Sequence, residues 1–392
     1  MLGSAHRGRG DARGPDDEAT DQPAPDTDAA EPNGPRQPLA FEPGDDDGWH
    51  ELARGYRLAG LLLSAHRMGL LRLLSDGEVQ QVDAMATHLL ADRKLLADIC
   101  RALRATGLLE QVADGWRLTP AGARLASDHV ASLELDAMAE DYRRWGELDR
   151  HARTLWRDGR TEPDRHGDAD VDSSVQAARR YARRMSSRRR LQAARLVGGV
   201  EPTRPVTVLD AWGGDGYVSR EICASWPHAT CTVLEIPTVA RIAGEACAGH
   251  PRIAVVAGDV LTGDPAAALG GGTVDVVVLS HVLQSLTERR RRELSAQIAR
   301  VLAPGGCLLS SEFVLRWNDR DSLDVLLWTV ARTAANWQGD ALSASEQDLL
   351  LRGSGLAAVA SWWVTRSSRA VLGVKPAAGV EPALRPVAAG TR

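Results

Sequence analysis

Three acidic residues and a short glycine-rich loop stand where they could bind a nucleoside. The loop Asp210-Ala-Trp-Gly-Gly-Asp-Gly216 offers backbone that a ligand can approach closely, because glycine has no Cβ. Glu235 ends the next apolar run, and an acid there in a nucleotide-binding sheet typically accepts hydrogen bonds from ribose hydroxyls. Asp259 follows a third apolar run, where a carboxylate can accept a hydrogen bond from an adenine amino group. The sequence therefore predicts a nucleoside site formed by Asp210, Gly214, Gly216, Glu235 and Asp259.

Signatures of other ligands are missing from the sequence. The dinucleotide pattern GxGxxG and the phosphate-binding pattern GxxxxGK[ST] do not occur, which argues against NAD and ATP. The five cysteines are scattered, without a CxxC pair or a Cys/His cluster. We therefore expect free thiols and no bound metal.

The loop and the acids depend on a regular alternation of apolar runs with helix-like segments. The five runs expected to form strands are Val206–Leu209, Thr230–Leu234, Ile253–Ala257, Val274–Leu279 and Cys307–Ser311. Alternating strands and helices predict an α/β fold with a Rossmann-like, doubly wound parallel sheet. Such a sheet binds ligands at the C-terminal ends of its strands, where the loop and the acids lie.

The N-terminal half has a different pattern. Residues 1–50 hold twelve acids against four arginines, and residues 1–47 are too polar to bury a core, so we expect a disordered acidic tail there. Helical periodicity follows from Trp49, and Asp114-Gly115 between two short β-prone runs predicts a hairpin. Three helices and a hairpin predict a winged helix, which binds DNA or forms a dimer.

Composition and spacing suggest five segments. They are a disordered tail at 1–47, a winged helix at 48–130, a helical linker at 131–200, a nucleoside-binding domain at 201–376 and a second disordered tail at 377–392. A net charge of −5 gives no basic footprint for nucleic acid, and no apolar run is long enough to span a membrane. The N-terminus lacks the apolar core of a secretory signal, so a cytoplasmic protein is expected.

The order of short motifs resembles the class I S-adenosylmethionine-dependent methyltransferases. Within them the chain is most similar to the small-molecule O-methyltransferases of plants and bacterial natural-product pathways, which have an N-terminal winged-helix dimerisation domain. The matching motifs include Gly107-Leu108-Leu109, Leu118-Thr119-Pro120, Tyr181-Ala-Arg-Arg-Met185, Val208-Leu209-Asp210, Leu234-Glu235-Ile236-Pro237, Gly258-Asp259-Val260, Ser280-His281-Val282-Leu283, Leu302-Ala303-Pro304-Gly305-Gly306 and Ser311-Glu312.

The resemblance implies S-adenosylmethionine as cofactor, a small-molecule substrate, and a homodimer in which one subunit's N-terminal helices close the other's pocket. Nucleic acid and membranes are not expected as partners. The cofactor site would also include Trp212, Val260 and Ser280. The substrate pocket would include Met185, Trp145 and Asn336.

Three departures from the family pattern lie at the site. Trp212 stands at the first glycine of the loop Asp-x-Gly-x-Gly-x-Gly, where it could pack in the core, stack on a ligand or narrow the cofactor site. Gln284 stands where the family has the histidine general base. A supporting Glu-Arg-Thr triplet falls on 341–343, which is Ala-Leu-Ser, whereas Glu312 matches the other supporting acid.

A glutamine amide cannot take a proton at neutral pH, which leaves three interpretations. The nucleophile could need no base, as with an amine, an ionised phenolate or an acidic enol carbon, and Gln284 would then orient the substrate in the pocket. His281 or Glu312 could replace the base. Methyl transfer could also have been lost in favour of decarboxylation, hydroxylation, cyclisation or a pericyclic reaction.

We expect an enzyme, with Gln284, His281 and Glu312 as candidate catalytic residues. The favoured function is methylation of a small specialised metabolite in natural-product or antibiotic biosynthesis, without the usual histidine base. A non-methylating enzyme of the same fold is the alternative, and a winged-helix DNA-binding regulator is the third hypothesis.

Overall fold

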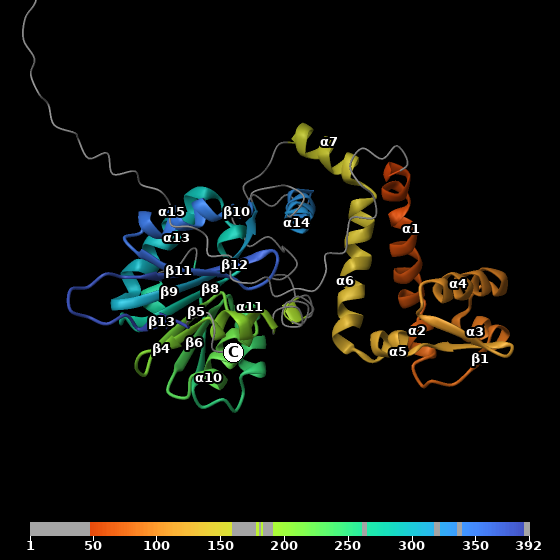
Figure 1. The fold of residues 1–392 in the computed structure, drawn as a ribbon, viewed down its shortest axis with the longest axis horizontal. Coiled ribbons are helices and arrows are strands. Elements are labelled where there is room, and N and C mark those ends of the chain that lie inside the picture. Colours follow the sequence, from red (N-terminus) through yellow and green to blue (C-terminus); the bar gives the residue numbers. More distant parts are fainter. Residues whose placement is uncertain are drawn as a thin grey trace, which may run out of the picture. The chain divides into compact units, whose positions relative to one another are not determined.

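A computed structural model of the chain describes residues 48–158, 178–179, 182, 191–260, 265–316, 322–334 and 339–387. The acidic tail expected at residues 1–47 lies outside the described residues. The described residues form a mostly helical N-terminal part and a C-terminal part built on a central sheet (Figure 1), and each part is described by itself.

Eight strands form the central sheet of the C-terminal part. Their order is β11-β12-β9-β8-β5-β6-β7, and β10 pairs with β9. Strands β5 to β9 pair in parallel, whereas β12 is antiparallel to β9 and β11. This arrangement confirms the predicted doubly wound sheet. The strands are β5 Thr207–Ala211, β6 Thr230–Glu235, β7 Ile253–Ala257, β8 Val274–Ser280, β9 Leu302–Leu315, β10 Leu342–Ser343, β11 Ala357–Trp363 and β12 Ser368–Val374.

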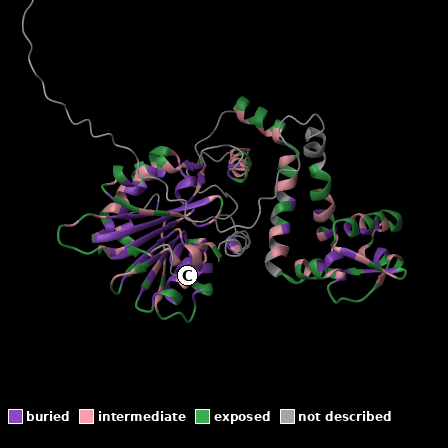
Figure 2. Cartoon of the chain, viewed as in Figure 1, coloured by how far each residue is buried: buried purple, intermediate pink, exposed green. Residues whose placement is uncertain are grey.

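Helices cover both faces of this sheet because successive strand residues point in opposite directions. Val208 and Val278 belong to a core cluster that includes residues of α10, whereas Leu209 and Leu279 belong to a second cluster that includes residues of α13 and α15. Figure 2 shows the central strands almost wholly buried between these layers. The helices of this part are α10 Tyr217–Ser225, α11 Pro237–Ala246, α12 Pro265–Ala268, α13 Glu288–Val301, α14 Leu323–Ala334 and α15 Ala344–Gly353, with a 3₁₀ turn, η1, at Leu283–Ser285.

The chain reverses its direction across the sheet at β5. After β5 it runs outward through β6 and β7, and it then returns to place β8 on the other side of β5. Such a switch point opens a crevice outside the carboxyl ends of the two central strands. The loops that follow β5 and β8 therefore border the expected ligand site.

The N-terminal part holds the hairpin predicted at Asp114-Gly115, because β2 and β3 pair antiparallel across it and β1 adds a third strand. Asp92 caps α4 by accepting the backbone N–H of Leu95 (2.8 Å), and the Thr119 hydroxyl accepts that of Gly122 (3.1 Å) at α5. The elements are α1 Gly48–Arg67, α2 Leu70–Leu73, β1 Gln80–Gln81, α3 Val82–Leu89, α4 Arg93–Ala105, β2 Leu109–Val112, β3 Gly115–Leu118, α5 Pro120–Ser127, α6 His129–Trp145 and α7 Leu148–Asp158.

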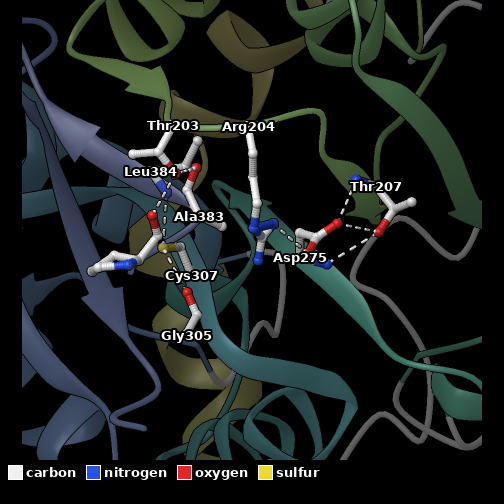
Figure 3. A network of polar contacts seen from close by, with 9 residues as sticks. Thr203, Arg204, Thr207, Asp275, Gly305, Cys307, Ala383 and Leu384 are labelled. Atoms are coloured by element: carbon white, nitrogen blue, oxygen red, sulfur yellow. Dashed lines mark hydrogen bonds and ion pairs between the residues drawn. The ribbon is translucent and has the colours of Figure 1, made fainter. Parts of the chain in front are cut away.

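The prediction of a disordered tail at 377–392 is wrong for residues 377–387. Strand β13 (Leu384–Pro386) pairs antiparallel with β4 (Val200–Pro202), and the Leu384 side chain is buried. Figure 3 shows Thr203 facing Ala383, whose carbonyl accepts the Thr203 N–H (3.1 Å), and Leu384 N–H donating to Cys307 Sγ (3.4 Å). The segment is ordered despite its Pro-rich composition because β4 supplies its backbone partners and the core accepts Leu384.

A second group in Figure 3 joins the starts of β5 and β8. The Asp275 carboxylate accepts hydrogen bonds from the Thr207 N–H (2.9 Å) and hydroxyl (2.8 Å), and it pairs with Arg204 (2.8 Å). These bonds fix the two central strands at the end opposite the crevice. Among the described residues, no helix is long and apolar enough to cross a membrane.

Candidate functional site

The glycine loop between β5 and α10 is shaped by close contacts under its glycines. A Cβ on Gly213 would lie 2.7 Å from the carboxyl carbon of Asp210, and a Cβ on Gly216 would lie 2.6 Å from Cys247 Sγ. Gly214 and Gly216 also have φ of 62° and 78°, which L residues rarely adopt. A Cβ on Gly214 would lie 4.0 Å from the Tyr217 ring, an ordinary van der Waals contact, so it is the positive φ and not crowding that favours glycine at this position.

Asp210 lies beneath this loop and holds it to α10. Its carboxylate Oδ2 accepts the Ser219 hydroxyl at 2.7 Å, and Oδ1 has no hydrogen-bond partner among the described residues. Burial raises the pKa of Asp210 to about 6, because charge is costly away from water. The position expected for Asp210 at the end of a strand is thus observed, with its carboxyl turned into the protein.

Glu235 ends β6 beside the loop. Its Oε1 accepts the Gly214 N–H (3.1 Å) and its Oε2 accepts the Ile236 N–H (2.9 Å). Burial is the main cause that raises the pKa of Glu235 to about 8, and Asp210 and Asp259 add to it. Each oxygen keeps a second lone pair for a ligand hydroxyl.

Asp259 and Val260 follow β7, next to the end of β6. The Gly258 N–H donates to the Glu235 carbonyl (2.8 Å), which keeps the two strand ends together. Asp259 is half-buried and Val260 is buried. The expected acid at the third strand is therefore next to the acid at the second.

Ser280 ends β8 on the other side of the switch point. Its hydroxyl lies 3.1 Å from the hydroxyl of Tyr217, the first residue of α10. This contact joins the loop after β5 to the end of β8. Sequence reasoning missed Tyr217, although its place directly after Gly216 was a usable signal.

Trp212 has a left-handed backbone, with φ of 61°, in the middle of the glycine loop. Its N–H donates to the Leu234 carbonyl (2.9 Å), and its side chain is partly buried against the core cluster that contains Leu209 and Val260. Of the three roles considered from the sequence, these contacts favour packing in the core.

Glu312 holds the turn that follows β8. Its carboxylate accepts the backbone N–H groups of Val282 (3.2 Å), Leu283 (3.1 Å) and Gln284 (3.3 Å), and the side chain is wholly buried. Burial raises the pKa of Glu312 to about 7, against the lowering effect of these donors and of Arg291. Because both oxygens already face backbone donors, Glu312 is suited to fixing η1 and poorly placed to take a proton from a substrate.

Arg291 supports the same turn from α13. Its Nε donates to the Leu283 carbonyl at 2.8 Å, and Nη2 donates to the Asp340 carbonyl. Sequence reasoning missed this residue, which belongs to a run of four arginines. Its spacing from the buried Leu294 and Ile298 on α13 was the signal that it faces inward.

Gln284 lies within this turn, and His281 directly precedes it. The Gln284 side chain is 2% exposed, and its Oε1 accepts the Phe313 N–H at 2.6 Å. His281 Nδ1 lies 3.4 Å from the same oxygen, and the imidazole packs edge-to-face on the Phe313 ring, with centroids 4.6 Å apart. The amide oxygen expected to face a substrate therefore faces the backbone of β9.

The three expected substrate contacts stay predictions. Trp145 is half-buried at the end of α6, and Met185 and Asn336 lie outside the described residues. Within the described ranges no cluster of three or more His, Cys, Asp and Glu side chains could hold a metal ion.

The arrangement fits a nucleoside ligand. The Gly214 backbone, the Glu235 carboxylate that accepts its N–H, and the half-buried Asp259 meet at the carboxyl ends of adjacent strands. A doubly wound sheet with such a site at its switch point defines a Rossmann-like nucleoside-binding enzyme class.

Comparison with known proteins identifies the family within that class. Residues 166–357 match the model of the O-methyltransferase domain family. Its members depend on S-adenosylmethionine, which makes this protein an S-adenosylmethionine-dependent methyltransferase with a small-molecule substrate.

Individual relatives are similar over most of their length. A 3-hydroxy-5-methyl-1-naphthoate 3-O-methyltransferase of Streptomyces sahachiroi is 27% identical, covering 76% of this chain and 86% of the relative. The N,N-dimethyltransferase OxyT of Streptomyces rimosus is 27% identical, covering 66% and 76%. Human N-acetylserotonin methyltransferase, solved with S-adenosylmethionine, has the same fold, with a TM-score of 0.72, 19% identity and coverage of 86% and 100%.

Proposed function

We propose that this enzyme methylates a small specialised metabolite at a site where residue 284 takes no proton. The observation that carries the proposal is the Gln284 amide, whose oxygen is committed to the Phe313 N–H at 2.6 Å. A neutral amide cannot act as a general base, so the group that does so in related enzymes has no counterpart at this position.

The cofactor would lie over the carboxyl ends of β5, β6 and β7. In this proposal Glu235 accepts hydrogen bonds from the ribose hydroxyls, Asp259 accepts one from the adenine amino group, and Gly214 and Gly216 let the loop approach the ligand. Ser280 would border the same region, whereas Trp212 and Val260 belong to the adjoining core cluster. S-adenosylmethionine supplies an electrophilic methyl group, and the protein's part is to hold the nucleophile in line with it.

The relatives support a small, largely aromatic acceptor. One is named for a hydroxynaphthoate and another for N,N-dimethylation, so oxygen and nitrogen nucleophiles both occur among similar chains. Phe313 packs edge-to-face on Trp328 of α14, with centroids 5.3 Å apart, and both side chains are half-buried. This aromatic pair beside the η1 turn suits a planar substrate.

The test is a methylation assay with S-adenosylmethionine and a panel of hydroxynaphthoates and aromatic amines, read by mass spectrometry. We expect a product heavier by one methylene unit and an equal amount of S-adenosylhomocysteine. Calorimetry reports cofactor binding separately. A wild-type enzyme that binds the cofactor, yet yields no methylated product across the panel, would favour the non-methylating alternative.

We infer that residues 48–130 form a winged-helix dimerisation domain, that residues 131–200 contribute to the substrate pocket, and that the cytoplasmic enzyme works as a homodimer. Leu58 on α1 and Leu95 on α4 are 63% and 59% exposed, and exposed apolar side chains mark interfaces. On α4, Lys94 (2.9 Å) and Arg101 (3.1 Å) share Asp98 as their acidic partner, and Arg93 pairs with Asp83, so three of the four basic side chains of that helix already have an acidic partner.

Light scattering tests the dimer. We expect a mass twice the 42.1 kDa of one chain, and a shift toward the single-chain mass in Leu58→Glu. Lys94→Glu is the matched control, because its side chain is 87% exposed and paired only along its own helix. A wild-type mass of one chain at micromolar concentration would contradict the dimer.

A further inference from the structure

We propose that His281 accepts the proton of the substrate nucleophile at Nε2, and that Gln284 is the positioning residue that keeps the other imidazole hydrogen on Nδ1. The inference rests on the proposed methyl transfer and names the group that serves it. Four observations carry it, starting with the orientation of the Gln284 amide.

The Phe313 N–H fixes which way that amide points. A backbone N–H is always a donor, so the atom 2.6 Å from it must be the amide oxygen and not the NH₂ group. Interchanging the two ends of the amide would place two donors against each other in a buried site. The side chain is 2% exposed, so water cannot relieve such a clash.

The same oxygen then determines the tautomer of His281. It lies 3.4 Å from His281 Nδ1, and because an amide oxygen can only accept a hydrogen bond, this contact requires the hydrogen on Nδ1. A neutral imidazole with hydrogen on Nδ1 carries its lone pair on Nε2. The Gln284 oxygen therefore makes Nε2 the basic atom of His281.

The backbone of the loop after β8 is strained at His281, next to the switch point. His281 has φ of 62°, and its backbone N–H donates to the Ser311 carbonyl at 2.7 Å. Four non-glycine residues of the described ranges have a left-handed backbone, and two of them, Trp212 and His281, lie in the loops after β5 and β8. A left-handed backbone is unfavourable for such residues, and strain of this kind gathers at functional sites.

Glu312 and Arg291 fix the backbone between His281 and Gln284. The Glu312 carboxylate binds the N–H groups of residues 282–284, and Arg291 binds the Leu283 carbonyl, so the segment joining His281 to Gln284 is fixed from both sides. This support explains how a hydrogen bond can set the tautomer, since the donor and the acceptor lie on one rigid turn.

The step balances without a further reactant. The proton on the substrate oxygen or nitrogen moves to Nε2, and its bonding electrons stay on the nucleophile, which forms the new bond to the methyl carbon. The electrons of the methyl–sulfur bond leave with sulfur. The resulting imidazolium still donates Nδ1–H to Gln284 and releases the new proton to solvent after turnover.

Nitrogen NMR on the full-length protein tests the tautomer without any substrate. With ¹⁵N-histidine labelling, the His281 signals are assigned by their loss in His281→Asn. We expect the neutral ring to carry hydrogen on Nδ1 in the wild type, and a mixture of both tautomers in Gln284→Leu. A wild-type ring with hydrogen on Nε2 overturns the proposal, whether or not the enzyme methylates anything.

Kinetics on the same variants test the proton acceptor. His281→Asn keeps a donor near the Nδ1 position and tolerates a left-handed backbone, but it lacks Nε2. We expect kcat to fall roughly 100- to 10,000-fold with an unchanged Kd for S-adenosylmethionine, the usual effect of losing a positioned base. His250→Asn, at an exposed position, is the matched control and should keep wild-type turnover.

These measurements distinguish proton transfer to His281 from methyl transfer as such. Turnover of His281→Asn within threefold of wild type, with the fold intact, would show that His281 takes no proton while methyl transfer stands. Gln284→Glu keeps an acceptor opposite both donors and should retain more turnover than Gln284→Leu. Equal loss in both Gln284 variants would show that the amide oxygen does not position His281.

Discussion

At the scale of single residues, ionisable groups at this site are shifted toward their neutral forms. Glu235 is the clearest case, since burial raises its pKa to about 8 although two backbone N–H groups favour its charge. A carboxyl that is protonated near neutral pH offers a ribose hydroxyl one acceptor fewer than an ionised carboxylate. Cofactor binding should therefore be linked to the ionisation of Glu235.

We expect the affinity for S-adenosylmethionine to rise with pH between 6 and 8, by up to tenfold per unit. The reason is that binding through two ribose hydroxyls needs the ionised carboxylate, which becomes populated as pH approaches about 8. Calorimetry at pH 6, 7 and 8 measures the dissociation constant.

Glu235→Ala should weaken binding by about 1.5–3 kcal/mol at pH 8, the contribution of hydrogen bonds to a charged group, and should remove most of the pH dependence. Glu381→Ala is the control, because Glu381 is exposed on the C-terminal segment. An affinity that is flat with pH in the wild type would show that the cofactor does not need an ionised Glu235.

The sequence predicted the positions of Asp210, Glu235 and Asp259 because each follows an apolar run that reads as a strand. It could not predict that the Gln284 side chain turns toward Phe313, because that contact depends on how far β9 continues beside β8. The strand was expected to end at Ser311, whereas β9 continues to Leu315 and offers the Phe313 N–H. Pairing across the sheet is not encoded in local periodicity.

At the scale of elements, the difference between sequence and structure is largest at the C-terminal segment. Proline, glycine and alanine favour disorder when a segment stands alone. Here β4 precedes the central sheet in the chain, and β13 pairs with one of its edges. Gly305 makes two further backbone bonds: its N–H donates to the Lys375 carbonyl (3.1 Å), and its carbonyl accepts the Ala383 N–H (2.9 Å). This segment is therefore ordered by partners that lie far from it in the sequence.

The segment should therefore contribute to the stability of the whole C-terminal part. We expect Leu384→Ala to lower the free energy of unfolding by about 2–4 kcal/mol, because Leu384 is 1% exposed and its removal leaves a cavity. Urea denaturation followed by circular dichroism measures the change.

Val380→Ala is the matched control from the same segment, since Val380 is 43% exposed and its truncation should cost under about 0.5 kcal/mol. If Leu384→Ala is as mild as this control, β13 does not hold the fold in solution, and the expectation of a disordered tail would be restored for that segment.

At the scale of the whole molecule, three buried carboxyls share one electrostatic consequence. Burial raises the pKa of Asp210 to about 6, of Glu312 to about 7 and of Glu235 to about 8, whereas the unfolded chain has values near 4. Between pH 4 and 8 the folded protein therefore binds more protons than the unfolded chain. Linkage then requires the free energy of unfolding to decrease as pH rises through this window.

We expect the ligand-free protein to be more stable at pH 5.5 than at pH 8, with a slope of up to about 1.4 kcal/mol per pH unit for each carboxyl inside its window. Urea titrations at pH 5.5, 6.5, 7.5 and 8.5 measure the slope. Glu235→Gln cannot ionise, so its stability should fall less steeply than that of the wild type between pH 6.5 and 8.5, and the difference isolates this carboxyl from the histidines that titrate nearby. Saturating S-adenosylmethionine should also flatten the wild-type slope in that range, because a ligand that favours ionised Glu235 removes its penalty. A wild-type stability that rises steadily from pH 5.5 to 8.5 would mean that the backbone donors, and not burial, govern these carboxyls.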